Sequence, residues 1–190
     1  MILEVLVEEA SAKAALEVLL PHIVPGIEFH VHAHEGKRDL LSKVPGRLAG
    51  YAHFPDAFVV ILVDRDAEDC EKLKRQLVSA ARRAGVGRRT LARIAIEELE
   101  AWLLGDVPAL AAAFPGVPLS LARRARFRDP DAVAGGTAET LLQVLREAGH
   151  TTTSKIDVAR RVAAHMDVET NRSHSFRAFR DGVRERMAAA

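Results

Sequence analysis

Two apolar runs, each ending in acidic residues, constrain the fold of this chain more than any other feature. The first, residues 2–7, leads into Glu8, and the second, residues 57–63, leads into Asp64 and Asp66. Nearly every residue of both runs is apolar, which is typical of strands buried on both faces of a parallel sheet. Such a sheet binds its ligands beyond the carboxyl ends of its strands. The sequence therefore predicts that these carboxylates gather at one sheet edge.

The surrounding chain alternates between helix and strand patterns. Helix patterns cover residues 11–20, 36–49 and 68–84, and further strand patterns cover residues 26–34 and 91–96. Pro21 is expected to close the first helix, and Pro45 to interrupt the second. Alternation of this kind is typical of right-handed βαβ units.

After residue 106 the pattern changes, because prolines separate short helical pieces and no strand pattern is convincing. Longer helices are expected over residues 137–148, 154–166 and 174–188. In the last of these, Ser173 is a candidate N-cap. The prediction is an α/β core, residues 1–105, with a helical lobe, residues 106–190, packed on it.

The composition excludes several classes of protein. A single cysteine, Cys70, rules out a disulfide framework and a cysteine-based zinc site, and suits a reducing compartment. The first residues read as a strand rather than a signal peptide. No apolar run approaches the length of a membrane span. We therefore expect a cytoplasmic protein with no membrane segment.

The net charge of +1 conceals an asymmetry along the chain. Residues 1–81 hold 9 Lys and Arg against 13 Asp and Glu, whereas residues 82–190 hold 18 against 13. The basic residues of the second part are Arg except for Lys155, and Arg is suited to bind phosphate. Codon preference in a GC-rich genome is an equally good explanation. The candidate nucleic-acid-binding residues are Arg123, Arg124, Arg126, Arg128, Arg172 and Arg177.

Carboxylates delivered to one edge repel one another unless a cation lies among them. Oxygen ligands of this kind suit Mg²⁺ or Mn²⁺. Asp64 and Asp66, two residues apart on an extended chain, are candidate metal ligands, and Glu8 is a candidate ligand or general base. The alternative is turn and N-cap chemistry for the aspartates and a solvated loop position for Glu8.

A third acidic group opens the helix pattern that follows the fourth strand. Glu98 and Glu100 are candidate metal ligands there, although acidic residues also favour a helix N-terminus for electrostatic reasons alone. Trp102 is expected to lie in the core. Lys155, near the start of a later helix, is a candidate to hold substrate phosphates and to stabilise developing charge.

Three histidines alternate along the second strand pattern. His30, His32 and His34 share one face of that strand, which would allow a three-histidine metal site. We favour the alternative, the exposed face of an edge strand, because no fourth ligand is evident.

These motifs resemble those of the Toprim domain, which occurs in topoisomerases, primases and the overcoming-lysogenization-defect nucleases. Within that group the chain is similar to the bacterial domain-of-unknown-function family 4276. The matching residues are 7–8, 62–66, 98–106, Lys155 and 173–176, and the stretch 98–104 is the most specific. One departure is Glu9, where the family usually has glycine; its carboxylate would either crowd the site or add a ligand.

The resemblance implies a Toprim-like fold and a Mg²⁺-dependent nuclease that works beside an ATPase partner, often in defence against phage. The leading interpretation is accordingly a metal-dependent phosphodiester hydrolase acting on nucleic acid, with Glu8 and Lys155 as catalytic residues. Two alternatives remain: a catalytically silent Toprim-like interaction module, and a nucleotide phosphatase.

Overall fold

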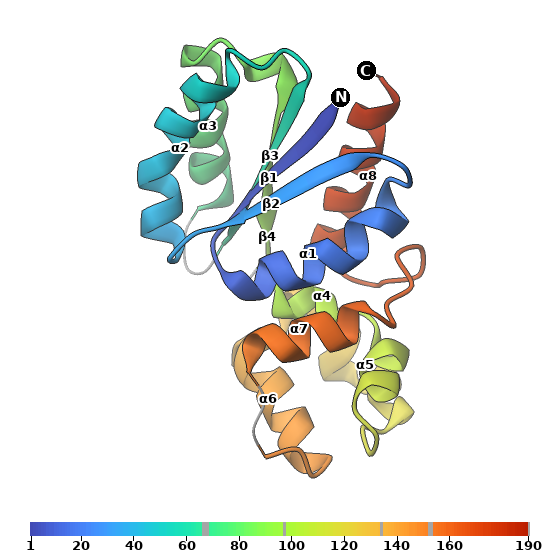
Figure 1. The fold of residues 1–190 in the computed structure, drawn as a ribbon. Coiled ribbons are helices and arrows are strands. Elements are labelled where there is room, and N and C mark those ends of the chain that lie inside the picture. Colours follow the sequence, from blue (N-terminus) through green and yellow to red (C-terminus); the bar gives the residue numbers. More distant parts are fainter. Residues whose placement is uncertain (66–68, 97, 134, 152–153, 190) are drawn as a thin grey trace.

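The fold is built on a four-stranded, all-parallel sheet (Figure 1). The computed structural model describes residues 1–65, 69–96, 98–133, 135–151 and 154–189. The strands are β1 (Ile2–Val7), β2 (Glu28–Ala33), β3 (Ala57–Asp64) and β4 (Thr90–Ala95), in the order β2-β1-β3-β4. Because all four run the same way, their carboxyl ends share one edge, and the predicted α/β fold is confirmed.

The central strand β3 explains why its sequence is apolar throughout. Phe58, Val60 and Leu62 are buried on one face, and Val59 and Ile61 are buried on the other. Each face therefore needs a cover of helices, as the unbroken apolar run predicted.

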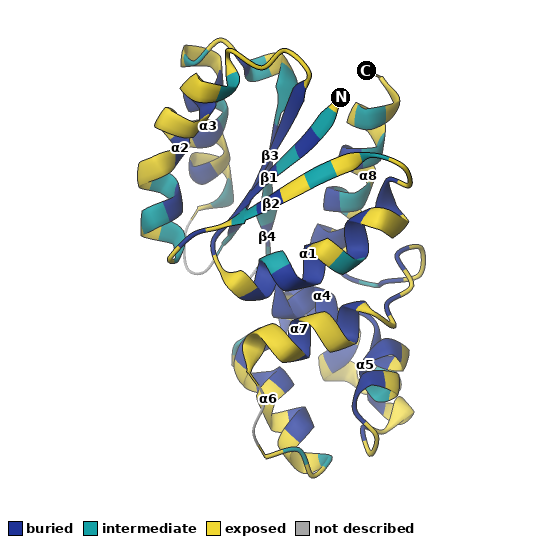
Figure 2. Ribbon diagram, in the orientation of Figure 1, coloured by how far each residue is buried: buried dark blue, intermediate teal, exposed yellow. Residues whose placement is uncertain are grey.

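Helices cover both faces of the sheet (Figure 1). On one face lie α2 (Lys37–Tyr51) and α3 (Cys70–Arg83), and on the other lie α1 (Ala10–Ile23) and α8 (His174–Ala188). Figure 2 shows that these helices bury their inner sides and expose their outer sides. None of the helices in the described part of the chain is long and apolar enough to cross a membrane.

Between β4 and α8 the chain forms the helical part of the fold. Its helices are α4 (Glu100–Leu104), α5 (Val107–Ala113), α6 (Thr137–Glu147) and α7 (Lys155–Ala163). Three short 3₁₀ turns lie in the described part of this segment, η2 (Leu119–Arg123), η3 (Ala125–Phe127) and η4 (Pro130–Ala132), whereas η1 (Gly87–Arg89) comes just before β4. Their apolar residues continue the cluster beneath α1, and α8 returns to the sheet. The division at residue 105 stays a prediction.

Two prolines lie inside helices, contrary to prediction. α1 runs through Pro21 to Ile23, and α2 runs through Pro45 without interruption. A proline removes one backbone hydrogen bond of the helix. In α1 that loss falls in the last turn, where burial of Leu20 and Ile23 offsets it. Pro45 lies on the exposed side of α2.

A buried polar network joins α8 to the helical part of the chain. The carboxylate of Asp131 accepts hydrogen bonds from the hydroxyls of Ser173 and Ser175, both at 2.8 Å. The indole of Trp102 donates to Ser175 at 2.9 Å. Ser173 also caps α8 by accepting from the backbone N–H of Phe176, which confirms the predicted cap. Ser173 and Ser175 therefore connect α8 to Asp131 of η4, and Ser175 also connects it to Trp102 of α4.

Candidate acidic site at the sheet edge

A pocket of about 250 Å³ lies at the carboxyl edge of the sheet. It is lined by Glu8, Glu9, Ser11, Ala12, Gly36, Lys37, Leu62, Asp64, Glu98, Leu99, Glu100 and Lys155. Four of the five predicted metal ligands and the predicted catalytic lysine thus share one pocket. The fifth ligand, Asp66, lies outside the described residues. Distant parts of the sequence meet here because parallel strands end at one edge.

Glu8 links the ends of two neighbouring strands. Its side chain is buried, and its Oε1 accepts a hydrogen bond of 2.8 Å from the backbone N–H of Asp64. The carboxylate is therefore held at the junction of β1 and β3 while it lines the pocket. A group that must take a proton from a bound water needs such fixed placement.

Glu98 serves the fold as well as the pocket. Its Oε2 accepts hydrogen bonds of 2.9 Å from the hydroxyl of Thr137 and from the backbone N–H of Ala138. These two residues begin α6, so Glu98 caps that helix from forty residues away. The sequence allowed an electrostatic role for this acidic group at a helix N-terminus, but at the helix that begins beside it and not at α6.

Glu100 is a buried carboxylate in a crowded acidic neighbourhood. Burial raises its pKa, the nearby Lys155 lowers it, and the charges of Glu98 and Glu9 raise it again. The net effect is a pKa above the ordinary value of 4.5. This carboxyl therefore holds its proton to higher pH than a solvated glutamate, unless a cation is added to the pocket.

Lys155 places a positive charge among these carboxylates. Its Nζ lies 3.8 Å from Oε1 of Glu100 and 4.0 Å from Oε2 of Glu9. Burial opposes its charge, but the carboxylates of Glu100, Glu9, Glu98 and Asp64 outweigh burial and raise its pKa above 10.5. Lys155 is consequently protonated at neutral pH and balances part of the acidic charge.

Two pocket residues have roles that the sequence left open or missed. Glu9, the departure from the family pattern, lines the pocket, and its carboxylate pairs with Lys155. Lys37 was not predicted; it lines the pocket and its Nζ donates to the carbonyl oxygen of Arg65 at 3.3 Å. The signal was available, since Lys37 closely follows the carboxyl end of β2 at this same edge.

The donor set of the pocket suits a hard divalent cation, because its acidic groups offer carboxylate oxygens. Within residues 1–65, 69–96, 98–133, 135–151 and 154–189, no three His, Cys, Asp or Glu side chains are grouped so as to hold an ion. In this arrangement Lys155 supplies positive charge where the carboxylates meet.

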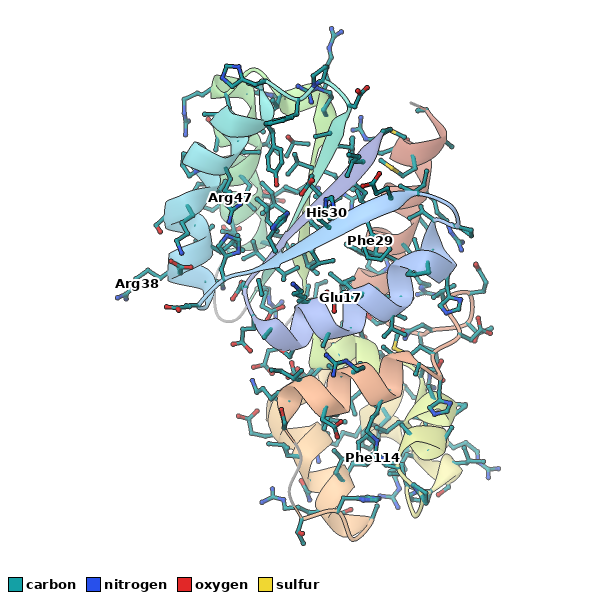
Figure 3. All side chains as sticks on the ribbon, in the orientation of Figure 1. Glu17, Phe29, His30, Arg38, Arg47 and Phe114 are labelled. Atoms are coloured by element: carbon teal, nitrogen blue, oxygen red, sulfur yellow. The ribbon has the colours of Figure 1, made fainter. Side chains whose placement is uncertain are left out.

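The histidines of β2 surround a different carboxylate. Nδ1 of His30 lies 3.0 Å from Oε1 of Glu4, and Nε2 of His32 lies 2.6 Å from its Oε2, to which the hydroxyl of Tyr51 also donates at 3.0 Å. His34 instead donates from Nδ1 to the carbonyl oxygen of Val7. Figure 3 shows His30 on β2, the edge strand. The edge-strand interpretation agrees with this arrangement, except that His34 is buried.

The Glu4 cluster predicts a loss of stability in acid. Burial opposes the charge of Glu4, but hydrogen bonds from His30, His32 and Tyr51 hold its pKa below the ordinary value of 4.5. Near and below pH 4.5 the unfolded chain therefore binds more protons at this group than the folded chain, and stability falls as pH falls. Urea unfolding between pH 6 and pH 3 should show a shallower decline for Glu4→Gln. Parallel declines for the two proteins would contradict this role.

The predicted arginines lie apart from the pocket lining. Arg123, Arg124 and Arg128 are exposed around η2 and η3, and Arg177 is exposed on α8. Arg126 is also exposed and donates from Nη2 to the hydroxyl of Thr140 at 2.7 Å. Arg172 is half-buried and donates from Nη1 to the carbonyl oxygen of Ala122 at 3.0 Å. Their binding of nucleic acid stays a prediction.

Comparison with known proteins gives a match at the level of a family. Searches of curated proteins and of solved structures found no match. One family model does match, and its match runs from the end of β1 into α8, so it includes all the pocket residues named above. Because residues 7–184 match the model of the domain of unknown function DUF4276, the chain belongs to that family.

Proposed function

We propose that this protein is a Mg²⁺- or Mn²⁺-dependent phosphodiester hydrolase that acts on nucleic acid. The observation that carries the proposal is the pocket at the carboxyl edge. Among the described residues, five carboxylates and two lysines line it, contributed by β3, α2, α4, α7 and the loops after β1 and β4. A Toprim-like active site, a cytoplasmic location and an ATPase partner in phage defence are parts of the same proposal. They follow from the motif resemblance.

The predicted site residues would have distinct tasks, Asp66 among them although it lies outside the described residues. Asp64 and Asp66 would hold the divalent ion, and Glu98 or Glu100 would complete a second position. Such ions polarise a phosphoryl oxygen and lower the pKa of bound water. Glu8 would accept the proton of the attacking water. The hydrogen bond from the Asp64 N–H uses its Oε1, and this bond would fix the carboxylate in place.

The two lysines would meet the phosphate of the substrate. Lys155 balances the carboxylates in the protein without substrate. An incoming cation would take over that balance, and the ammonium group could then hold a phosphate oxygen and stabilise the charge of the transition state. Lys37 lines the pocket at the start of α2 and would hold a second phosphate oxygen.

Metal binding is tested most directly by thermal unfolding. Saturating Mg²⁺ or Mn²⁺ should raise the melting temperature, because a ligand that binds only the folded state stabilises it by about 2.7 kcal/mol at a hundred times its Kd. For a chain of this size that corresponds to roughly 5–10 °C. Differential scanning calorimetry should show this shift in the wild type and not in Asp64→Asn.

The matched control for this experiment is Asp56→Asn. Asp56 is exposed and just precedes β3, so it lies at the amino end of the strand that Asp64 ends. Asp56→Asn should keep the full metal response. An equal response in wild type and Asp64→Asn would remove Asp64 from the metal site.

A second candidate function is a catalytically silent interaction module. The contacts of Lys155 with Glu9 and Glu100 favour it, because part of the acidic charge is already balanced within the chain. In that case the pocket would accept a cation or an arginine of a protein partner and have no turnover. A nucleotide phosphatase would be recognised by release of inorganic phosphate from nucleoside monophosphates without cleavage of oligonucleotides.

A further inference from the structure

The positive charge of this protein is concentrated on the two helices α2 and α3, called here the basic helix layer. Together they hold nine Lys and Arg against two Asp and Glu. The whole chain has 27 and 26, so the rest of the chain holds eighteen basic residues against twenty-four acidic ones. A third of the basic residues therefore lies on two helices that pack side by side on one sheet face (Figure 1).

The charges of the layer face solvent. Its exposed basic residues are Arg38, Lys43, Arg47, Lys72, Lys74, Arg75, Arg82 and Arg83. Arg38 extends from α2 away from the sheet in Figure 3. Two of these residues, Lys43 and Arg75, pair with an acidic residue one helical turn away, and exposed pairs of that kind are weak. The layer thus presents a field of positive charge.

The layer adjoins the acidic pocket. Its remaining basic residue, Lys37, is half-buried and lines that pocket at the first residue of α2. A phosphate backbone that lies along the layer would therefore pass Lys37 before it reaches the carboxylates of the pocket. The helices, of 15 and 14 residues, are about 21 Å long, which corresponds to roughly twelve phosphates of a duplex at 1.7 Å of axis per charge.

We propose that the basic helix layer binds the phosphate backbone of nucleic acid and directs it to the acidic pocket. The proposal rests on the proposed function for the identity of the polyanion, although binding itself needs neither metal nor hydrolysis. It places the principal binding surface on α2 and α3 rather than on the arginines around η2 and η3. That group is smaller, with four arginines against the nine Lys and Arg of the layer.

Two variants that each remove four positive charges test this placement. The layer variant combines Lys72→Gln, Arg75→Gln, Arg82→Gln and Arg83→Gln on α3. The matched control combines Arg123→Gln, Arg124→Gln, Arg126→Gln and Arg128→Gln. All eight side chains are exposed. Net charge falls equally in both, so a difference between them reports position rather than overall charge. Melting temperatures within a few degrees of wild type would establish that both variants fold.

Binding is measured by fluorescence anisotropy with labelled 20-base-pair DNA and RNA duplexes, in EDTA, from 50 to 200 mM salt. The wild-type affinity should fall with salt, because each neutralised phosphate contributes about 0.9 to the slope of log K against log salt. The layer variant should bind at least tenfold more weakly at 100 mM salt, with a slope reduced by up to about 3.6. The control should lose less than threefold.

Three results would overturn the proposal. The first is an equal or larger loss in the control than in the layer variant, and the second is binding that does not respond to salt. The third is a wild type that binds polyglutamate through the layer but binds neither duplex, since its partner would then be an acidic protein. Cleavage that survives in the layer variant at unchanged KM would count only against this proposal. Layer-dependent binding without cleavage would count only against the hydrolase.

Discussion

Glu8→Gln is expected to lower nucleic-acid cleavage by roughly a hundredfold or more, the typical contribution of a positioned general base. Glutamine keeps the size of the side chain and still accepts the hydrogen bond that the Asp64 N–H donates to Oε1. The substitution therefore removes charge and basicity while the local structure is retained. Nucleic-acid binding in EDTA should be unchanged, because Glu8 belongs to the pocket and not to the basic helix layer.

The measurement is cleavage of labelled single- and double-stranded DNA and RNA with Mn²⁺, in the presence of any ATPase encoded beside this gene. Glu17→Gln is the matched control, since Glu17 is an exposed glutamate of α1 that pairs with Lys13 outside the pocket (Figure 3). It should cleave like the wild type. Equal cleavage by Glu8→Gln and wild type would mean a contaminant or another active site. No cleavage by either, with the partner present, would favour the interaction module.

Trp102→Ala is expected to destabilise the folded protein by about 3–5 kcal/mol, the usual cost of truncating a buried aromatic side chain. Trp102 is 1% exposed and packs against the rings of Phe176 and Phe179, with centroids 5.3 and 5.1 Å away. Its loss would leave a cavity between α4 and α8. It would also remove the hydrogen bond that the indole N–H donates to the buried hydroxyl of Ser175.

Urea unfolding followed by circular dichroism measures this loss. Trp102→Phe is the informative control, because it keeps an aromatic ring against Phe176 and Phe179 but removes the N–H donor. It should cost about 1–3 kcal/mol, less than alanine, since the larger part of the effect is packing. A loss below 1 kcal/mol for Trp102→Ala would contradict the assignment of this residue to the shared core.

The strands and the meeting of the acidic residues could be predicted from the sequence because both depend on local patterns. An unbroken apolar run such as β3 has to be buried on both faces, and parallel strands have to end together. Glu8 and Asp64 follow the strand patterns of β1 and β3, and Glu100 follows the turn after β4, so their meeting in one pocket needed no knowledge of side-chain packing. The cap at Ser173 was equally local, since it depends on neighbouring residues.

Long-range contacts decided what else these residues do. One oxygen of Glu98 caps α6, whose first residues lie about forty positions further along the chain. Lys37 enters the pocket because β2 ends at the shared edge. Pro21 stays within α1 because the burial of Leu20 and Ile23 outweighs the lost hydrogen bond. Propensity is a weak local term that tertiary packing overrides.

Charge shows the same division most clearly. Residues 1–81 have a net negative charge, and for this reason the sequence predicted a phosphate-binding surface within residues 82–190. In the folded protein Glu8, Glu9 and Asp64 line the pocket at the sheet edge, while most of the Lys and Arg of residues 1–81 lie on α2 and α3. The sequence by itself determined the sheet and its acidic edge, because burial of apolar strands is a local requirement. Only the tertiary structure decided the surface charge, because the electrostatic field depends on distances in space and not on separation along the chain.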